Sequence, residues 1–123
     1  MTTLETSDLP GGHATAAKIT SSASGTSGAQ LVLTVDEFKG RRIRVNGLFK
    51  GSGSTYAGNQ RLQIYDGVNN SYVEVPNDAT WRQLAIAVDI PTSATILQIR
   101  MIAGNDTTAS LVLLATGVTV KSY

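Results

Sequence analysis

The sequence contains no cysteine and a single histidine, His13. A chain without cysteine has neither disulfides nor thiolate metal ligands, and one imidazole cannot supply a histidine-based metal cluster. We therefore expect no metal site and no cofactor. No apolar run approaches the roughly 18 residues of a membrane-spanning helix. Residues 1–20 lack the basic start and apolar stretch of a signal peptide, so neither kind of segment is expected.

Charge is also scarce, at 15% of the residues, and the formal net charge is +1. The ten Lys and Arg residues are dispersed along the chain. A nucleic-acid-binding domain shows a clustered basic face, so we expect neither a nucleic-acid nor an anionic-membrane partner. The apolar content of 41% in 123 residues indicates one globular domain over residues 1–123.

Two-residue alternation of apolar and polar side chains recurs along the chain and is interrupted by Gly, Ser, Asn and Pro. Ile43, Val45 and Phe49 lie on one face of the clearest strand. Residues 62–65 and 72–75 predict a hairpin that turns at Asp66-Gly67. A single helical turn fits residues 36–39, and the last strand is expected to bend at Gly117. About eight strands without helices between them predict an all-β fold, an antiparallel β-sandwich.

Three stretches, at residues 13–20, 39–51 and 80–91, resemble the jelly-roll carbohydrate-binding modules attached to bacterial glycanases and to phage tail proteins. Residues 13–20 match a strand that precedes a small-residue loop, and residues 39–51 match a turn glycine with its following strand. In residues 80–91, Trp81 precedes an alternating strand that ends at Pro91. The resemblance runs from Ala14 onward and implies a jelly roll that binds carbohydrate and catalyses nothing.

The sequence departs from that family at both ends. The family's last strand often carries an acidic pair before its final Val-x-Val, which contributes to a structural calcium site. Thr116 and Gly117 occupy the matching positions, so no calcium site is carried over. The family also tends to begin with an aromatic-containing strand that residues 1–12 do not show. We expect these residues to form a loose N-terminal segment of a shortened module.

No arrangement of residues indicates catalysis. Most of the nine acidic residues fall in predicted turns, where Asp hydrogen-bonds its own backbone. Glu74 and Asp89 are centred in predicted strands, and a carboxylate pair is what a glycosidase uses. We interpret both as exposed strand charges. Residues 51–54 are not a phosphate loop because no Gly-Lys-Ser/Thr follows them. The chain is therefore predicted not to be an enzyme.

Two aromatic residues are candidates for contact with a sugar, because indole and phenol rings pack against C–H faces. Trp81 begins an alternating strand, which favours a ring packed over the edge of the core. Tyr56 lies in a Gly- and Ser-rich tract, where a core has no need of it. A ligand contact and simple exposure are equally compatible with Tyr56.

Polar residues alternate with core residues on three of the predicted strands. If the three strands share a sheet, their outward side chains form one surface rich in amide and guanidinium groups, which hydrogen-bond hydroxyls and carboxylates. A solvated outer face and a protein–protein interface remain alternatives, since Arg is common at interfaces. The predicted ligand-binding residues are Arg44, Asn46, Gln63, Tyr65, Gln98 and Arg100, with Tyr56 closing from its loop.

The leading functional hypothesis is a non-catalytic carbohydrate-binding module. It would be an accessory or receptor-contact domain of a phage virion or of a secreted bacterial protein, located on the virion or outside the cell. Its partner would be a glycan or cell-surface polysaccharide. The alternative is a structural virion domain, a tail-fibre segment or capsid decoration protein, that forms a homotrimer and docks on other virion proteins.

Overall fold

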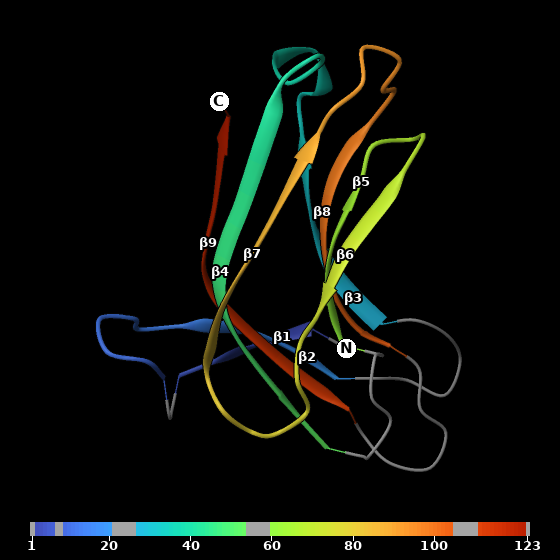
Figure 1. The fold of residues 1–123 in the computed structure, drawn as a ribbon. Coiled ribbons are helices and arrows are strands. Elements are labelled where there is room, and N and C mark those ends of the chain that lie inside the picture. The colour runs from blue at the N-terminus through green and yellow to red at the C-terminus, as the bar shows by residue number, and fades with distance from the viewer. Residues whose placement is uncertain (1, 7–8, 21–26, 54–59, 105–110, 123) are drawn as a thin grey trace.

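Nine β-strands and one 3₁₀ turn make up the described parts of the chain (Figure 1). The computed structural model describes residues 2–6, 9–20, 27–53, 60–104 and 111–122. The elements are β1 (Thr2–Glu5), β2 (Ala16–Thr20), β3 (Ser27–Leu33), η1 (Val35–Glu37), β4 (Arg42–Ser52), β5 (Arg61–Tyr65), β6 (Asn70–Glu74), β7 (Arg82–Asp89), β8 (Leu97–Gly104) and β9 (Val112–Ser122). The predicted helical turn is present one residue early, as η1.

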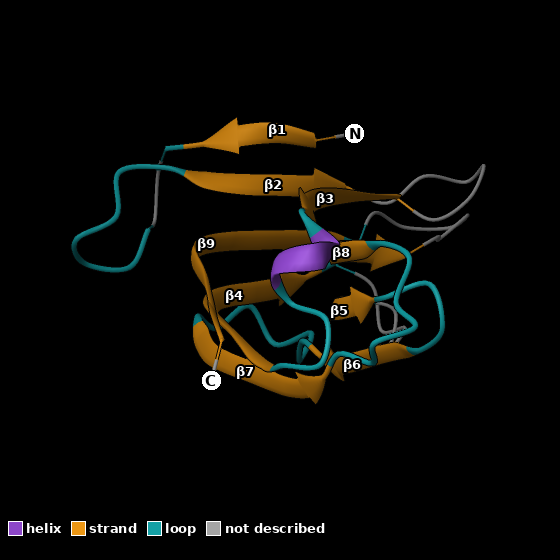
Figure 2. Cartoon of the chain, turned by 90° about the horizontal axis from the view of Figure 1, so that it is seen from above, coloured by secondary structure: helices purple, strands orange, loops and turns teal. Residues whose placement is uncertain are grey.

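The strands form two antiparallel sheets, as predicted (Figures 1 and 2). The five-stranded sheet has the order β1-β2-β9-β4-β7, and the four-stranded sheet has the order β3-β8-β5-β6. The predicted hairpin is β5 and β6, with Tyr65 opposite Asn70. We expected residues 1–12 to be loose, whereas Thr2–Glu5 form β1 and pair with β2.

The core lies between the two sheets. Ile43, Val45 and Phe49 of β4 point inward, and Leu62 of β5 and Ile99 of β8 lie in the same cluster; each of the five is fully buried. Burial of one such side chain stabilises the fold by about 1.5–3 kcal/mol. The inward face predicted for the strand at Ile43 is confirmed. The sandwich is closed at its sides, where β6 lies beside β7 and β2 beside β3.

The turn between β5 and β6 is fixed by a buried carboxylate. Asp66 is 4% exposed, and its Oδ1 accepts hydrogen bonds from the backbone N–H groups of Val68 (2.8 Å) and Asn69 (2.6 Å). Gly67 supplies the positive φ of 88° that this turn requires. The turn sets the register of the hairpin and thereby the positions of Tyr65 and Asn70 on its outer face.

Strand β9 contains a β-bulge at Gly117, where the sequence predicts a bend. Asn46 pairs with Thr119 and Leu48 with Thr116, so two residues of β9 oppose the single residue between Asn46 and Leu48. Gly117 has a φ of 63°, which is characteristic of a bulge glycine. The extra residue changes which side chains face the core: odd positions face inward before the bulge, and Val118 and Val120 do so after it.

Candidate functional site

The outer face of the four-stranded sheet carries a continuous set of polar and aromatic side chains, which we call the amide face. The pairing places its residues in three rows across the four strands. The rows are Gly28, Ile102, Arg61 and Glu74; Gln30, Arg100, Gln63 and Tyr72; and Val32, Gln98, Tyr65 and Asn70. Four predicted site residues, Gln63, Tyr65, Gln98 and Arg100, therefore lie together on this face.

Two arginine side chains of the amide face are stacked on tyrosine rings. The guanidinium carbon of Arg100 lies 4.6 Å from the centre of the Tyr65 ring, and that of Arg61 lies 4.5 Å from the centre of the Tyr72 ring. Gln98 Oε1 also accepts a hydrogen bond from Arg100 Nε at 2.9 Å. Arg100 Nη2 donates to the same oxygen, so Arg100 is held by a ring and an amide, and Nη1 is the guanidinium nitrogen that Gln98 does not bind.

Gln63 lies at the centre of the amide face and is largely covered by its neighbours. Its side chain is 8% exposed, and its Nε2 donates a hydrogen bond to Asn70 Oδ1 at 3.1 Å. Most of its polar surface is thus directed at the protein. In this geometry the Gln63 side chain orients Asn70, and little of its surface is accessible to a ligand.

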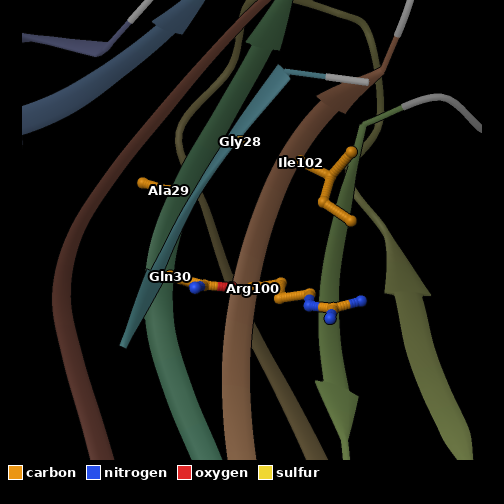
Figure 3. Close-up of a pocket in the computed structure, with 5 residues that line it drawn as sticks. All are labelled: Gly28, Ala29, Gln30, Arg100 and Ile102. Atoms are coloured by element: carbon orange, nitrogen blue, oxygen red, sulfur yellow. The ribbon is translucent and has the colours of Figure 1, made fainter. Parts of the chain in front are cut away.

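A hollow of about 250 Å³ opens at one end of the amide face, beside Arg100 (Figure 3). The side chains of Gln30, Arg100 and Ile102 point to the same side of the sheet, whereas Ala29 points away from it. Gly28 completes the lining and has no side chain to fill the space. The hollow therefore combines an amide and a guanidinium with an apolar wall, which suits a ligand with hydroxyl groups and a C–H face.

Three residues that line the hollow, Gln30, Ile102 and Gly28, are not among the predicted site residues. Gln30 alternates with the apolar Leu31, and the same kind of alternation identified Arg100. However, the sequence does not indicate that the strand containing Gln30 pairs with β8. Gly28 belongs to β3, although the tract at residues 21–28 was interpreted as a loop. It lies opposite Ile102 and in the same register as Gln30 opposite Arg100, and local alternation does not mark that pairing.

Arg44 and Asn46 do not belong to the amide face. Both lie on β4, in the five-stranded sheet, so the expectation that all three polar strands share one sheet is wrong for β4. Alternation shows which side chains of a strand avoid the core, but it does not show which of two sheets contains the strand. Arg44 and Asn46 line a separate hollow with Thr119 and Lys121. Tyr56 lies outside the described residues.

The two carboxylates considered for catalysis lie in different sheets. Glu74 is on β6, opposite Arg61, and Asp89 on β7 accepts a hydrogen bond from Arg42 Nη1 at 3.2 Å.

Within the described ranges, no three His, Cys, Asp or Glu residues are grouped as a metal site would need. The same ranges contain no helix of the length and apolarity that crossing a bilayer requires. Trp81 is half-buried just before β7.

Comparison with known proteins gives matches in structure only. No protein-family model matches the sequence, and no curated protein matches it. The enzymatically active domain of tailspike protein 4 from bacteriophage CBA120 superposes on 100% of this chain with a TM-score of 0.74 and 12% identity. This chain spans only 18% of that tailspike chain.

Carbohydrate-binding modules share the fold over most of their own length. The CBM22-1 xylan-binding domain of Xyn10C from Paenibacillus barcinonensis matches 99% of this chain and 80% of its own, with a TM-score of 0.65 and 14% identity. The module TmCBM61, solved with β-1,4-galactotriose, matches 99% of this chain and 82% of its own, with a TM-score of 0.60 and 14% identity.

The nine strands in two antiparallel sheets and these superpositions define the class: the chain has the jelly-roll fold of carbohydrate-binding modules. The predicted resemblance is confirmed for the fold. Because the identities are low, the likeness extends to the fold alone, and ligand and context have to be argued from the side chains.

Proposed function

We propose that this chain is a non-catalytic module that binds a glycan in the hollow beside Arg100. The observation that carries the proposal is one open hollow that is lined by Gln30, Arg100 and Ile102 (Figure 3). The amide and the guanidinium donate to sugar hydroxyls, and the apolar wall packs against ring C–H groups. Stacking of Arg100 on Tyr65 holds the guanidinium in place before the ligand arrives, so less side-chain entropy is lost on binding.

The biological setting of the proposal is a phage virion or a secreted bacterial protein, with a cell-surface polysaccharide as partner. The fold shared with the tailspike domain and with the xylan-binding module supports both settings. The non-catalytic role is supported by Glu74 and Asp89, which lie in different sheets, with Asp89 ion-paired to Arg42. The module would act by bringing its host protein to the polysaccharide.

A glycan array followed by calorimetry on the best glycan tests the proposal. We expect Arg100→Gln to weaken binding about tenfold, because it removes a charged donor at the ligand, and Gln30→Ala to weaken it by a smaller factor. Arg41→Gln is the matched control, since Arg41 is exposed and lines none of the hollows described. Equal affinity of Arg100→Gln and Arg41→Gln for the glycan would show that the hollow is not the site.

A second candidate function is an assembly domain of a virion that forms a homotrimer and docks on other virion proteins. The observation in its favour is the edge strand β3, where Leu31 is 46% and Val32 is 59% exposed. An apolar edge strand is a template for pairing with another chain. Light scattering during size-exclusion chromatography distinguishes the two: a trimer that Val32→Lys dissociates supports assembly, and a wild-type monomer contradicts it.

A further inference from the structure

The outer face of the five-stranded sheet contains two hollows that meet at Asn46. One has a volume of about 150 Å³ and is lined by Arg44, Asn46, Thr119 and Lys121. The other has a volume of about 230 Å³ and is lined by His13, Asn46, Gly47, Leu48, Gln83 and Gly117. Together they lie over β7, β4 and β9, and we call the two neighbouring hollows the groove, although each alone is smaller than the about 300–1,000 Å³ that is usual for a small-molecule site.

Arg44 and Lys121 place two positive charges at one end of this groove. They are directly opposite each other in the pairing of β4 with β9, and both are exposed. Like charges in opposite positions of adjacent strands are destabilising. Among the residues described, no carboxylate forms an ion pair with either. Arg42, two positions earlier on the same face of β4, is paired with Asp89.

The other polar groups of the first hollow also favour an electron-rich ligand. Gln83 Nε2 donates a hydrogen bond to Asn46 Oδ1 at 3.4 Å, so the Asn46 amide nitrogen is left to donate. Thr119 contributes a hydroxyl, and Arg44 and Lys121 have donors only. Three side chains with free donors and one hydroxyl therefore surround the space. A carboxylate or phosphate group is the natural acceptor, and a guanidinium can bind it through two hydrogen bonds.

The second hollow differs in character from the first. Leu48 is half-buried and gives it an apolar surface, and His13 and Gln83 stand at its sides. An apolar side chain with amide and imidazole groups beside it suits a sugar ring that continues from an anionic group at Arg44 and Lys121.

We propose that the groove binds an acidic polysaccharide, with the anionic group of one sugar held between Arg44 and Lys121. The inference rests on the proposed function in that the ligand is a glycan. It adds a second site on the opposite sheet from Arg100 and a chemical class of ligand. The bulge at Gly117 is part of the site, because it directs Thr119 and Lys121 to the outer face.

The test compares acidic oligosaccharides with neutral counterparts on the full chain. The probes are a uronic-acid oligosaccharide, its carboxyl-reduced form, a sialylated oligosaccharide with its asialo form, and a glycerol-phosphate oligomer. We expect at least one acidic probe to bind about tenfold more tightly than its neutral counterpart, and the difference to shrink as salt is added. Preference for the uronate or sialate identifies a carboxylate, and preference for the glycerol-phosphate oligomer identifies a phosphate.

Two charge-removing variants locate the site. Arg44→Gln and Lys121→Gln should each weaken binding of the acidic probe about tenfold, whereas Arg41→Gln, which removes the same charge elsewhere, should leave it unchanged. Because all three side chains are exposed, none of the variants should lower the unfolding midpoint, and removal of either of the two opposed charges should raise it slightly. Equal losses in Arg41→Gln and Arg44→Gln would overturn the proposal.

The remaining outcomes separate this inference from the proposed function. Neutral probes that bind in an Arg100-dependent manner, with no gain from an acidic group, would keep the proposed function and overturn the groove. Acidic probes that bind through Arg44 and are insensitive to Arg100→Gln would keep the groove and overturn the hollow beside Arg100. Tighter binding of a single-stranded DNA oligomer than of any acidic glycan would make the groove a nucleic-acid site and overturn the inference.

Discussion

Arg100 and Tyr65 are diagonal neighbours across β8 and β5, and the guanidinium of the first lies on the ring of the second at 4.6 Å. The direct partner of Arg100 in the pairing is Gln63, and that of Tyr65 is Gln98. Diagonal contacts are within reach of long and aromatic side chains. Because Gln98 also binds Arg100 Nε, Arg100, Tyr65 and Gln98 form one hydrogen-bonded and stacked unit of three residues.

Replacement of the Tyr65 ring should loosen this unit. We expect Tyr65→Leu to lower the free energy of unfolding by about 0.5–1 kcal/mol beyond the Tyr65→Phe variant, which keeps a ring for the guanidinium. Urea unfolding of both variants measures the difference. A double-mutant cycle with Arg100→Met isolates the pair, and a coupling energy of zero would mean that the stacking does not stabilise the protein.

Gly28 should be sensitive to the addition of one methyl group. A Cβ at this position would lie 2.9 Å from the carbonyl oxygen of Met101, on the neighbouring strand. Because backbone has to move to relieve the contact, we expect Gly28→Ala to cost about 1–3 kcal/mol of stability. Gly11→Ala is the control, since a Cβ there meets nothing within 4 Å. The prediction fails if the two variants unfold at the same temperature.

Gly117 should be costly to replace for two separable reasons. Its φ is 63°, and a Cβ would lie 2.8 Å from Cε1 of His13. We expect Gly117→Ala to lower the free energy of unfolding through two terms. One is the clash with His13, and the other is about 1–2 kcal/mol for an alanine in a left-handed backbone conformation. The double variant Gly117→Ala/His13→Ala, compared with His13→Ala alone, should retain only the backbone cost in chemical denaturation. No remaining cost in that comparison would show that the bulge rearranges.

Acid should remove the contribution of the Asp78–Arg82 pair. The side chain of Arg82 hydrogen-bonds Asp78 Oδ2, with Nε at 3.1 Å, and this contact holds the pKa of Asp78 below its ordinary value of 3.8. A carboxyl whose folded-state pKa is lowered stabilises the fold above its unfolded-state pKa. The contribution is then lost as the pH falls through the folded-state value.

Unfolding of Asp78→Asn and wild type at neutral and strongly acid pH measures this effect. We expect the variant to be less stable at neutral pH and the difference to vanish in acid. Both side chains are exposed, so the effect should be small and sensitive to salt. Arg82→Gln removes the same contact and should reproduce the pH dependence; a difference that persists in acid would point to another cause.

The inward faces of the strands were predictable from the sequence because they depend on local alternation. Ile43, Val45 and Leu62 were assigned correctly to the core side on this basis. The partner of each strand was not predictable in the same way. Strand β4 lies between β7 and β9, which follow it by many residues in the sequence. Alternation carries no information on such long-range pairing, so Arg44 was grouped with Arg100 although they lie on opposite sheets.

The hollows on the sheet surfaces were less predictable than the inward faces of the strands. Their shape depends on the positions of glycines and on the pairing register between strands. Gly28 lines the space beside Arg100 because β3 pairs with β8, with Gly28 opposite Ile102. Lys121 joins Arg44 only after the extra residue at Gly117. A sequence pattern records the residue types at these positions, but it does not record the strand opposite.

In β9, a substitution on the outer face and a change in the length of the strand have different effects on the protein. Substitution at Thr119 or Lys121 alters the chemistry of the groove and leaves the interior intact. Insertion of one residue after the bulge would exchange the two sides of the strand beyond it, so that Lys121 would enter the interior and Val120 would face solvent. The side chains that line the groove can therefore change through single substitutions, whereas the length of β9 is constrained by folding.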